Sequence, residues 1–174
     1  VSQQVGLALR KINKYHTVVI KSTVLPGTTE GVIKPILEKY SRKRIGDFGL
    51  CMNPEFLREG CALDDALHPD RIVIGQIDEE SGNILSKIYA KMTAPKLFTN
   101  LPTAELVKYT TNSLLATLIS FSNEIARIAE HTPKIDVVDV WKGIHLDKRL
   151  SPMMGKTRIR PGILSYISSG CGYG

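Results

Sequence analysis

The sequence predicts an α/β domain followed by a helical domain. In the first hundred residues, short runs of β-branched and apolar residues alternate with segments whose apolar residues recur at helical spacing. The segment from Thr103 to His131 then runs without proline or glycine, and the stretch after Gly143 is rich in glycine, proline and serine. We therefore expect a mostly parallel sheet with helices over residues 1–100, and helices over residues 101–174.

The elements of the α/β part follow from local patterns. Thr17 to Lys21 is a β-branched run of the kind found in buried parallel strands, and Pro26-Gly27 breaks the chain after it. Thr28 can cap the next helix, which extends to about Tyr40. We expect the remaining elements at these places: the end of a helix within 6–14, strands at 48–53, 71–75 and 96–99, and a helix at 79–92.

The helical part begins with a segment long enough for one continuous helix, Thr103 to His131. Its apolar residues form a stripe, made of Val107, Leu114, Leu118, Phe121, Ile125 and Ile128. The stripe indicates either an intramolecular core or a subunit interface, because so long a helix presents more apolar surface than the short remaining chain covers. A second helix is expected over Ile135 to Lys142.

Composition and charge limit the classes of function. Of 174 residues, 43% are hydrophobic and 23% charged, and no apolar run approaches the ~20 residues of a bilayer span. The net charge is +6, but the two basic clusters, 39–44 and 148–160, lack the interleaved aromatic residues of a single-strand nucleic-acid binder. We expect no membrane and no nucleic acid partner, and a phosphate-bearing small molecule as the ligand. A solvated helix end is the alternative for the first cluster.

Cysteine and histidine usage gives no sign of a disulfide framework or a metal site. The three cysteines and four histidines are irregularly spaced, and a reducing compartment, the cytoplasm, is expected. The Gly-x-Gly-x-x-Gly signature of a dinucleotide-binding loop does not occur in the chain. Because the chain begins without methionine and stops in a glycine-rich run at Gly174, we expect an internal piece of a longer protein, with any such loop outside it.

Two segments lie directly after predicted strands, where ligands bind in open α/β sheets. Lys21 to Thr29 supplies hydroxyl groups that either orient a ligand or satisfy backbone groups of the turn. Asn53 to Gly60 holds Glu55 and Glu59, which share a face if the segment turns as a helix. One of these carboxylates, desolvated beside the neighbouring hydrophobic pair, can serve as a general base. An exposed acidic helix start is the alternative.

The long helix carries a third candidate. Glu105, Lys108 and Asn112 fall at i, i+3 and i+7 and form a polar line over its first two turns. If this line faces a cleft, the lysine can hold an oxyanion and the asparagine amide can position a water or a hydroxyl group. Ordinary exposure of the three side chains to solvent is the alternative.

Several motifs in combination resemble one family. They are Ser22-Thr23-Val24 with Pro26-Gly27-Thr28-Thr29, Asn53-Pro54-Glu55-Phe56-Leu57-Arg58-Glu59-Gly60, His68-Pro69-Asp70-Arg71-Ile72-Val73-Ile74-Gly75, Ala104-Glu105, Lys108, Asn112, Ser120-Phe121, Asn123-Glu124, Gly143-Ile144, Asp147-Lys148-Arg149 and Gly170-Cys171-Gly172-Tyr173-Gly174. In this order they resemble the UDP-glucose 6-dehydrogenase family over nearly the whole chain. The second motif is highly specific for nucleotide-sugar dehydrogenases.

The resemblance implies a fold and an activity. Residues 1–100 would be the later part of a Rossmann-like NAD-binding domain, and residues 101–174 would be the central helical domain through which these enzymes form homodimers. Such an enzyme oxidises the primary alcohol of a nucleotide sugar twice, using two NAD+ and a cysteine that carries thiohemiacetal and thioester intermediates. The His68 to Gly75 motif favours UDP-glucose over GDP-mannose, and Phe56 to Gly60 differs from the pattern of UDP-N-acetylmannosamine enzymes.

The resemblance also implies roles for individual residues. Thr23 would contact NAD and a catalytic water, and Glu59 would lie by the nicotinamide. Glu55 would be the general base of thioester hydrolysis, Lys108 would stabilise the oxyanion, and Asn112 would assist it. The substrate site, which Glu55, Glu59, Lys108 and Asn112 share, would further include Phe56, Leu57, Arg58, Tyr166, Ile167, Ser168, Ser169, Gly170 and Gly174.

The C-terminal part of the resemblance carries one further role and two departures. Arg149 resembles the arginine that reaches into the substrate site of the neighbouring subunit. The nucleophilic cysteine of the family follows the glycine-rich run, so we expect it beyond Gly174 and assign Cys171 to packing. The stretch 151–164 looks longer than the usual connection in the family. A non-catalytic sugar-nucleotide-binding or dimerisation module is the alternative from another class.

Overall fold

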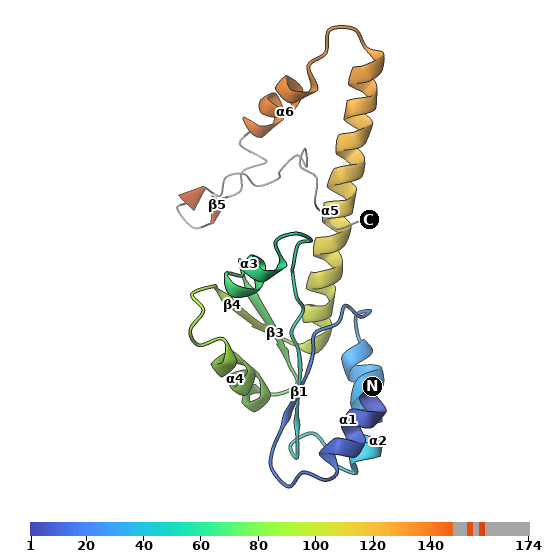
Figure 1. Ribbon diagram of the computed structural model, residues 1–174, viewed down its shortest axis with the longest axis vertical. Coiled ribbons are helices and arrows are strands. Elements are labelled where there is room, and N and C mark those ends of the chain that lie inside the picture. The colour runs from blue at the N-terminus through green and yellow to red at the C-terminus, as the bar shows by residue number, and fades with distance from the viewer. Residues whose placement is uncertain (148–152, 155–156, 159–174) are drawn as a thin grey trace. The chain divides into compact units, whose positions relative to one another are not determined.

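The protein is described by a computed structural model over residues 1–147, 153–154 and 157–158 (Figure 1). It divides into two compact units, the first comprising Val1–Thr111 and the second beginning at Asn112. One long helix, α5 (Leu101–His131), crosses this division, so the expected boundary at residue 100 stays a prediction.

A four-stranded mixed sheet forms the centre of the first unit. Its strands are β1 (Thr17–Ile20), β2 (Gly49–Met52), β3 (Ile72–Gln76) and β4 (Lys96–Thr99), in the order β1-β2-β3-β4. The pairs β1–β2 and β3–β4 are parallel, as expected, but β2 and β3 are antiparallel. The reason is the connection between them, which stays beyond the carboxyl end of β2 and holds the short helix α3 (Ala62–Leu67), so that β3 enters the sheet from that end (Figure 1).

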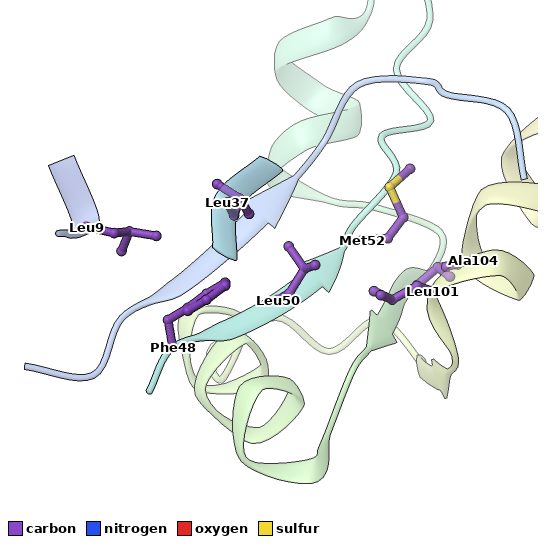
Figure 2. Packing of buried hydrophobic residues seen from close by; sticks show 8 residues of the cluster. Leu9, Leu37, Phe48, Leu50, Met52, Leu101 and Ala104 are labelled. Atoms are coloured by element: carbon purple, nitrogen blue, oxygen red, sulfur yellow. The ribbon is translucent and has the colours of Figure 1, made fainter. Parts of the chain in front are cut away.

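Helices pack on both sides of the sheet because its buried side chains point alternately to the two faces. One face is covered by α1 (Ser2–Leu9), by the π-helical turn η1 (Thr29–Ile33) with α2 (Lys34–Ser41), and by the start of α5. The core on this face contains Leu9, Leu37, Phe48, Leu50, Met52, Val73, Leu101 and Ala104 (Figure 2). On the other face, α4 (Glu79–Ile88) contributes Leu85 to a second cluster with Cys51, Ile72 and Ile74.

Two local expectations for these helices were wrong. The first helix ends at Leu9, rather than extending toward Lys14. Thr28 is the residue before η1, but its backbone is already helical and its side chain makes no capping hydrogen bond. A capping residue needs an extended backbone so that its side chain can accept from the N–H groups two or three residues later. Thr28 does not have this backbone conformation. The backbone groups at this start are bound by a different residue, described below.

The long helix α5 is confirmed as one continuous helix of 31 residues. Its first turn belongs to the first unit, where Leu101 and Ala104 are buried in the core. The contact with β3 is close: a Cβ added at Gly75 would lie 2.6 Å from the Cβ of Ala104. Glycine at this position therefore lets the start of α5 approach the sheet, which fixes where the next turns of the helix lie.

The second unit contains the rest of α5 and α6 (Val137–His145). Asp136 caps α6 by accepting hydrogen bonds from the backbone N–H groups of Val138 and Asp139. The helix packs through Trp141, whose ring meets that of Phe121 edge-on at a centroid distance of 6.1 Å. Two short strands, β5 (Met153–Met154) and β6 (Thr157–Arg158), follow α6 in the sequence and form an antiparallel pair.

The apolar stripe of α5 is only partly covered. Leu114, Phe121 and Ile128 remain about half exposed, while the remaining members of the stripe are partly buried. Within the described part of the chain, no helix is both long and apolar enough to cross a membrane.

Candidate functional site

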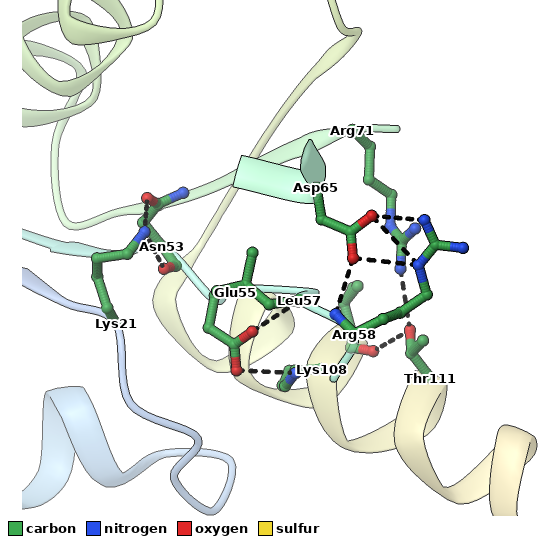
Figure 3. A network of polar contacts seen from close by, with 10 residues as sticks. Lys21, Asn53, Glu55, Leu57, Arg58, Asp65, Arg71, Lys108 and Thr111 are labelled. Atoms are coloured by element: carbon green, nitrogen blue, oxygen red, sulfur yellow. Dashed lines mark hydrogen bonds and ion pairs between the residues drawn. The ribbon is translucent and has the colours of Figure 1, made fainter. Parts of the chain in front are cut away.

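The site lies beyond the carboxyl ends of β1 and β2, where a buried polar network ties the chain together. Asn53, the first residue after β2, is 2% exposed, and its backbone N–H donates to the carbonyl of Ile20 at 2.8 Å. Its side-chain oxygen accepts from the Lys21 ammonium at 2.8 Å (Figure 3). The same oxygen accepts from the Tyr89 hydroxyl, and the amide nitrogen donates to the Val73 carbonyl at 2.8 Å. This asparagine thereby fixes the directions in which the loops after β1 and β2 leave the sheet.

Glu55 and Lys108 form an ion pair at this end of the sheet. The Lys108 ammonium lies 3.3 Å from Oε1 of Glu55, and the other oxygen, Oε2, accepts the backbone N–H of Leu57 at 2.7 Å (Figure 3). Lys108 is 6% exposed, whereas the Glu55 side chain is 38% exposed. The ammonium is thus shielded, and the carboxylate remains accessible to a water or a ligand.

The pKa of Glu55 is lowered from its ordinary value of 4.5. Desolvation is the largest single influence on this group and by itself raises the pKa. The hydrogen bond from Leu57 and the positive charges of Lys108 and Lys21 together outweigh it. Glu55 is therefore ionised at neutral pH.

The ring of Phe56 lies close to two cations. The Arg71 guanidinium is 3.9 Å from the centre of the Phe56 ring, and the Lys108 ammonium is 5.3 Å from it. Arg71 also donates to the hydroxyl of Thr111, one turn further along α5, at 3.5 Å. The Phe56 ring is therefore close to two positive charges from different parts of the chain, one directly before β3 and one in α5.

Arg58 is held by a carboxylate of α3. Its guanidinium donates to both oxygens of Asp65, the shortest contact being 2.6 Å, and its backbone N–H donates to the same carboxylate at 2.8 Å (Figure 3). This pairing raises the pKa of Arg58 and lowers that of Asp65. Leu57, next to it, is 45% exposed. The pair connects the loop after β2 to α3. Any ligand that contacts Arg58 therefore meets a guanidinium that is already paired with Asp65.

Glu55 and Glu59 do not share a helical face, which corrects the sequence-based expectation. Residues 53–58 adopt no helical conformation, and α3 begins only at Ala62. Glu59 is exposed, and Gly60 after it has φ +82, a conformation that breaks a helical turn at this point. Thr23, in the loop after β1, is exposed as well.

The polar line on α5 does not act as one group. Lys108 faces the site, but Glu105 is completely buried and accepts the backbone N–H groups of Gly27 and Thr29. Asn112 is half-buried four residues after Lys108 and begins the second unit. The remaining predicted site residues, Arg149, Tyr166, Ile167, Ser168, Ser169, Gly170 and Gly174, lie outside the described residues.

Sequence reasoning missed several residues of the site, among them Lys21, Arg71 and Asp65. Lys21 directly follows β1 and Arg71 directly precedes β3, and a charged residue at the end of an apolar strand is the signal that could have found them. Asp65 lies on a helix six residues long, and the sequence around it shows no pattern that marks it as a site residue.

In the described part of the chain, no group of three or more His, Cys, Asp or Glu side chains is placed to hold a metal ion.

Comparison with known proteins identifies the family. Residues 2–93 match the NAD binding domain, and residues 102–174 the central domain, of the UDP-glucose/GDP-mannose dehydrogenase family. The chain therefore belongs to this family of nucleotide-sugar dehydrogenases, which confirms both the resemblance and the fold. The matching domain makes NAD its cofactor.

Individual relatives carry two different substrate names. The GDP-mannose 6-dehydrogenase of Azotobacter vinelandii is 43% identical over 164 residues, which are 94% of this chain and 37% of that protein. The UDP-glucose 6-dehydrogenase of Rickettsia bellii is 47% identical over 142 residues, 80% of this chain and 31% of that protein. A crystal structure of the Pseudomonas aeruginosa GDP-mannose dehydrogenase matches with a TM-score of 0.81 at 41% identity, covering 86% of this chain and 34% of that one. The chain thus spans about a third of these relatives.

Proposed function

We propose that the chain is part of an NAD-dependent dehydrogenase that oxidises the primary alcohol of UDP-glucose to the carboxylate of UDP-glucuronate. The observation that carries this proposal is the pairing of a shielded ammonium, Lys108, with an accessible carboxylate, Glu55, at 3.3 Å. The two come from α5 and from the loop after β2, 53 residues apart in the sequence. Acyl chemistry on a sugar carboxyl group needs both a cation for an oxyanion and a base for water.

Lys108 has the properties of an oxyanion-stabilising group. Its ammonium is largely removed from solvent, and a charge in such an environment interacts more strongly with a developing negative charge than it does in water. The Phe56 ring and Glu55 hold the ammonium in place, so little reorganisation is needed when the oxyanion forms. Asn112, one turn further along α5, is proposed to assist through its amide.

Glu55 is proposed as the base that takes a proton from the water attacking the thioester. Its lowered pKa keeps the carboxylate ionised at neutral pH, and its exposed fraction leaves room for that water. The nucleophilic cysteine that carries the thioester is proposed to lie beyond Gly174. NAD+, when bound, supplies the hydride acceptor for both oxidations.

Thr23 and Glu59 are the residues proposed to meet NAD. Both are exposed on loops that follow the carboxyl ends of neighbouring parallel strands, the edge at which open α/β sheets bind ligands. A Cβ added at Gly27, in the loop that carries Thr23, would meet nothing within 4 Å, so the space on that side of the Gly27 backbone is open. Thr23 and Glu59 thus fit one side of a dinucleotide site.

Phe56, Leu57 and Arg58 are proposed to line the sugar-nucleotide site, together with the C-terminal residues 166–170 and Gly174. We also propose that two copies of the chain pair through α5 and that Arg149 reaches the partner's substrate. The half-exposed side chains of Leu114, Phe121 and Ile128 support pairing, because together they leave an apolar stripe exposed on the helix.

The free thiols of Cys51 and Cys61 fit the reducing cytoplasm proposed for the enzyme.

GDP-mannose is the second candidate substrate. It is favoured by the 43% identity to the Azotobacter vinelandii enzyme and by the TM-score of 0.81 with the Pseudomonas aeruginosa structure. UDP-N-acetylmannosamine is the third alternative.

The deciding experiment is NADH formation by the full-length protein with NAD+ and each of the three nucleotide sugars in turn. We expect the highest kcat/KM with UDP-glucose and two NADH formed per sugar. A higher value with GDP-mannose would transfer the proposal to that substrate. Binding of a nucleotide sugar without NADH from any of them would support the non-catalytic module instead.

A further inference from the structure

Glu105 is a buried carboxylate that the proposed chemistry does not use. It lies in the second turn of α5, is 0% exposed, and both of its oxygens accept backbone hydrogen bonds. Oε1 accepts the N–H of Thr29 at 2.7 Å, and Oε2 accepts the N–H of Gly27. The donors precede the acceptor by 76 and 78 residues, so these bonds join two distant parts of the chain.

The two N–H groups belong to the place where the loop after β1 turns into η1. The first N–H groups of a helix have no partner within the helix and need an acceptor from elsewhere. The residue that the sequence suggested for this purpose, Thr28, makes no capping hydrogen bond. Glu105 supplies the acceptors in its place, and its carboxylate also suits the positive end of a helix dipole.

The same stretch of α5 carries Lys108 three residues later, and both side chains are buried in the first unit. Residues three apart lie on the same face of a helix. A single turn of α5 therefore holds the loop that carries Thr23 and presents the ammonium that meets Glu55.

We propose that Glu105 is a positioning residue. It fixes the position of the loop that carries Thr23 relative to Lys108, so that the residues proposed to meet NAD and the residue proposed to meet the oxyanion are held in one arrangement. This inference rests on the proposed function for the roles of Thr23 and Lys108. The clamp itself rests only on the geometry of Glu105, Gly27 and Thr29.

The substitution Glu105→Gln tests the clamp sharply. Glutamine has nearly the same shape, but only one of its terminal atoms is an acceptor, and its amide N–H₂ group must face one of the two backbone donors. One of the two hydrogen bonds to the backbone is thereby lost, because the amide N–H₂ group and a backbone N–H group face each other as two donors. The packed volume of the side chain changes little. Glu130→Gln, at an exposed position on the same helix, is the matched control.

Amide hydrogen exchange in the full-length protein, without any ligand, measures the clamp directly. In Glu105→Gln we expect the amides of Gly27 and Thr29 to exchange about tenfold faster or more, with no change in Glu130→Gln. Unchanged exchange of both amides in Glu105→Gln would overturn the clamp. Should that variant not fold, the wild-type protein decides alone: both amides must be protected at least about tenfold, and free exchange of both would overturn the clamp.

Ligand affinity separates positioning from a merely structural contribution. At a temperature where circular dichroism shows the variant folded, we expect Glu105→Gln to weaken NAD+ binding about tenfold and to leave the Kd of UDP-glucose within about twofold. Equal affinities for NAD+ in variant and wild type, or equal losses for both ligands, would overturn the positioning role. A wild-type protein that oxidises no nucleotide sugar would instead refute the proposed function, and the exchange result would still decide the clamp.

Discussion

The ammonium of Lys108 lies 3.3 Å from Oε1 of Glu55, and this contact favours the ionised form of the carboxyl group. It joins the start of α5 to the loop after β2, so neither side chain is placed by its own element alone. Lys108 lowers the pKa of Glu55 by its charge and by its hydrogen bond, against the opposing effect of burial. The ion pair and the hydrogen bond from Leu57 together keep this partly buried carboxylate ionised.

Replacing the lysine should raise the pKa of Glu55. In Lys108→Met the apolar stem is retained while the charge and the hydrogen bond are lost, so desolvation is less opposed and the carboxyl group titrates at a higher pH than in the wild type. A carbon-detected NMR titration of the Glu55 carboxyl group measures the change. Lys142→Met, which removes an exposed partner of Asp139, is the control and should leave Glu55 unaffected. An equal or lower pKa in Lys108→Met would contradict the coupling.

The pH dependence of turnover follows from the same shift. A group with a depressed pKa is ionised above that value and becomes protonated only as the pH falls through it. If Glu55 is the base for hydrolysis, the acid limb of the hydrolysis step should therefore lie below pH 4.5 in the wild-type enzyme. Single-turnover rates across an acid pH series, in buffers where the protein stays folded, measure this limb. A limb centred well above that pH would mean that another group controls the step.

Lys108→Ala should reduce turnover far more than cofactor binding. The lysine is proposed to meet the developing oxyanion, so its loss should cost on the order of 3 kcal/mol at the transition state, or about a hundredfold in kcat. The KM for NAD+ should change little. Steady-state kinetics of the full-length protein, with Lys142→Ala as control, measure both parameters. A raised KM for the nucleotide sugar with unchanged kcat would assign Lys108 to ground-state binding instead.

Asn53→Ala should destabilise the protein through the buried network. Its side chain is the partner of the Val73 carbonyl, and leaving that buried acceptor without a donor should lower the free energy of unfolding by about 1–3 kcal/mol. Urea unfolding of the full-length protein measures the change. Asn83→Ala, at an exposed position of α4, is the matched control and should be close to neutral. Equal stabilities of the two variants would mean that the network contributes little.

Elements with strong local patterns were predictable from the sequence. The β-branched run at Thr17 to Lys21 became β1, and the segment from Thr103 to His131 lies within the single helix α5. The path of β3 was not predictable, because the apolar pattern of a buried strand is the same whether it runs parallel or antiparallel to its neighbour.

The site was predictable in its residue types but not in its contacts. Spacing along α5 put Glu105 and Lys108 on one face, but it could not show that one caps a distant loop while the other pairs with Glu55. The direction of the Glu55 pKa shift also depends on Lys21 and Lys108, which are far from it in sequence. Sequence spacing likewise suggested a helical face for Glu55 and Glu59, which exists only if the loop is helical.

The most direct test of the central claim is a single-turnover experiment with Glu55→Gln in the full-length protein. Glutamine keeps the size of the side chain but removes the proposed base, while Glu30→Gln, at an exposed position of η1, serves as control. We predict a burst of NADH and a covalent sugar-nucleotide adduct on the enzyme, because hydride transfer survives and thioester hydrolysis stalls. Release of free uronate at the wild-type rate, or the absence of both burst and adduct, would contradict the role of Glu55.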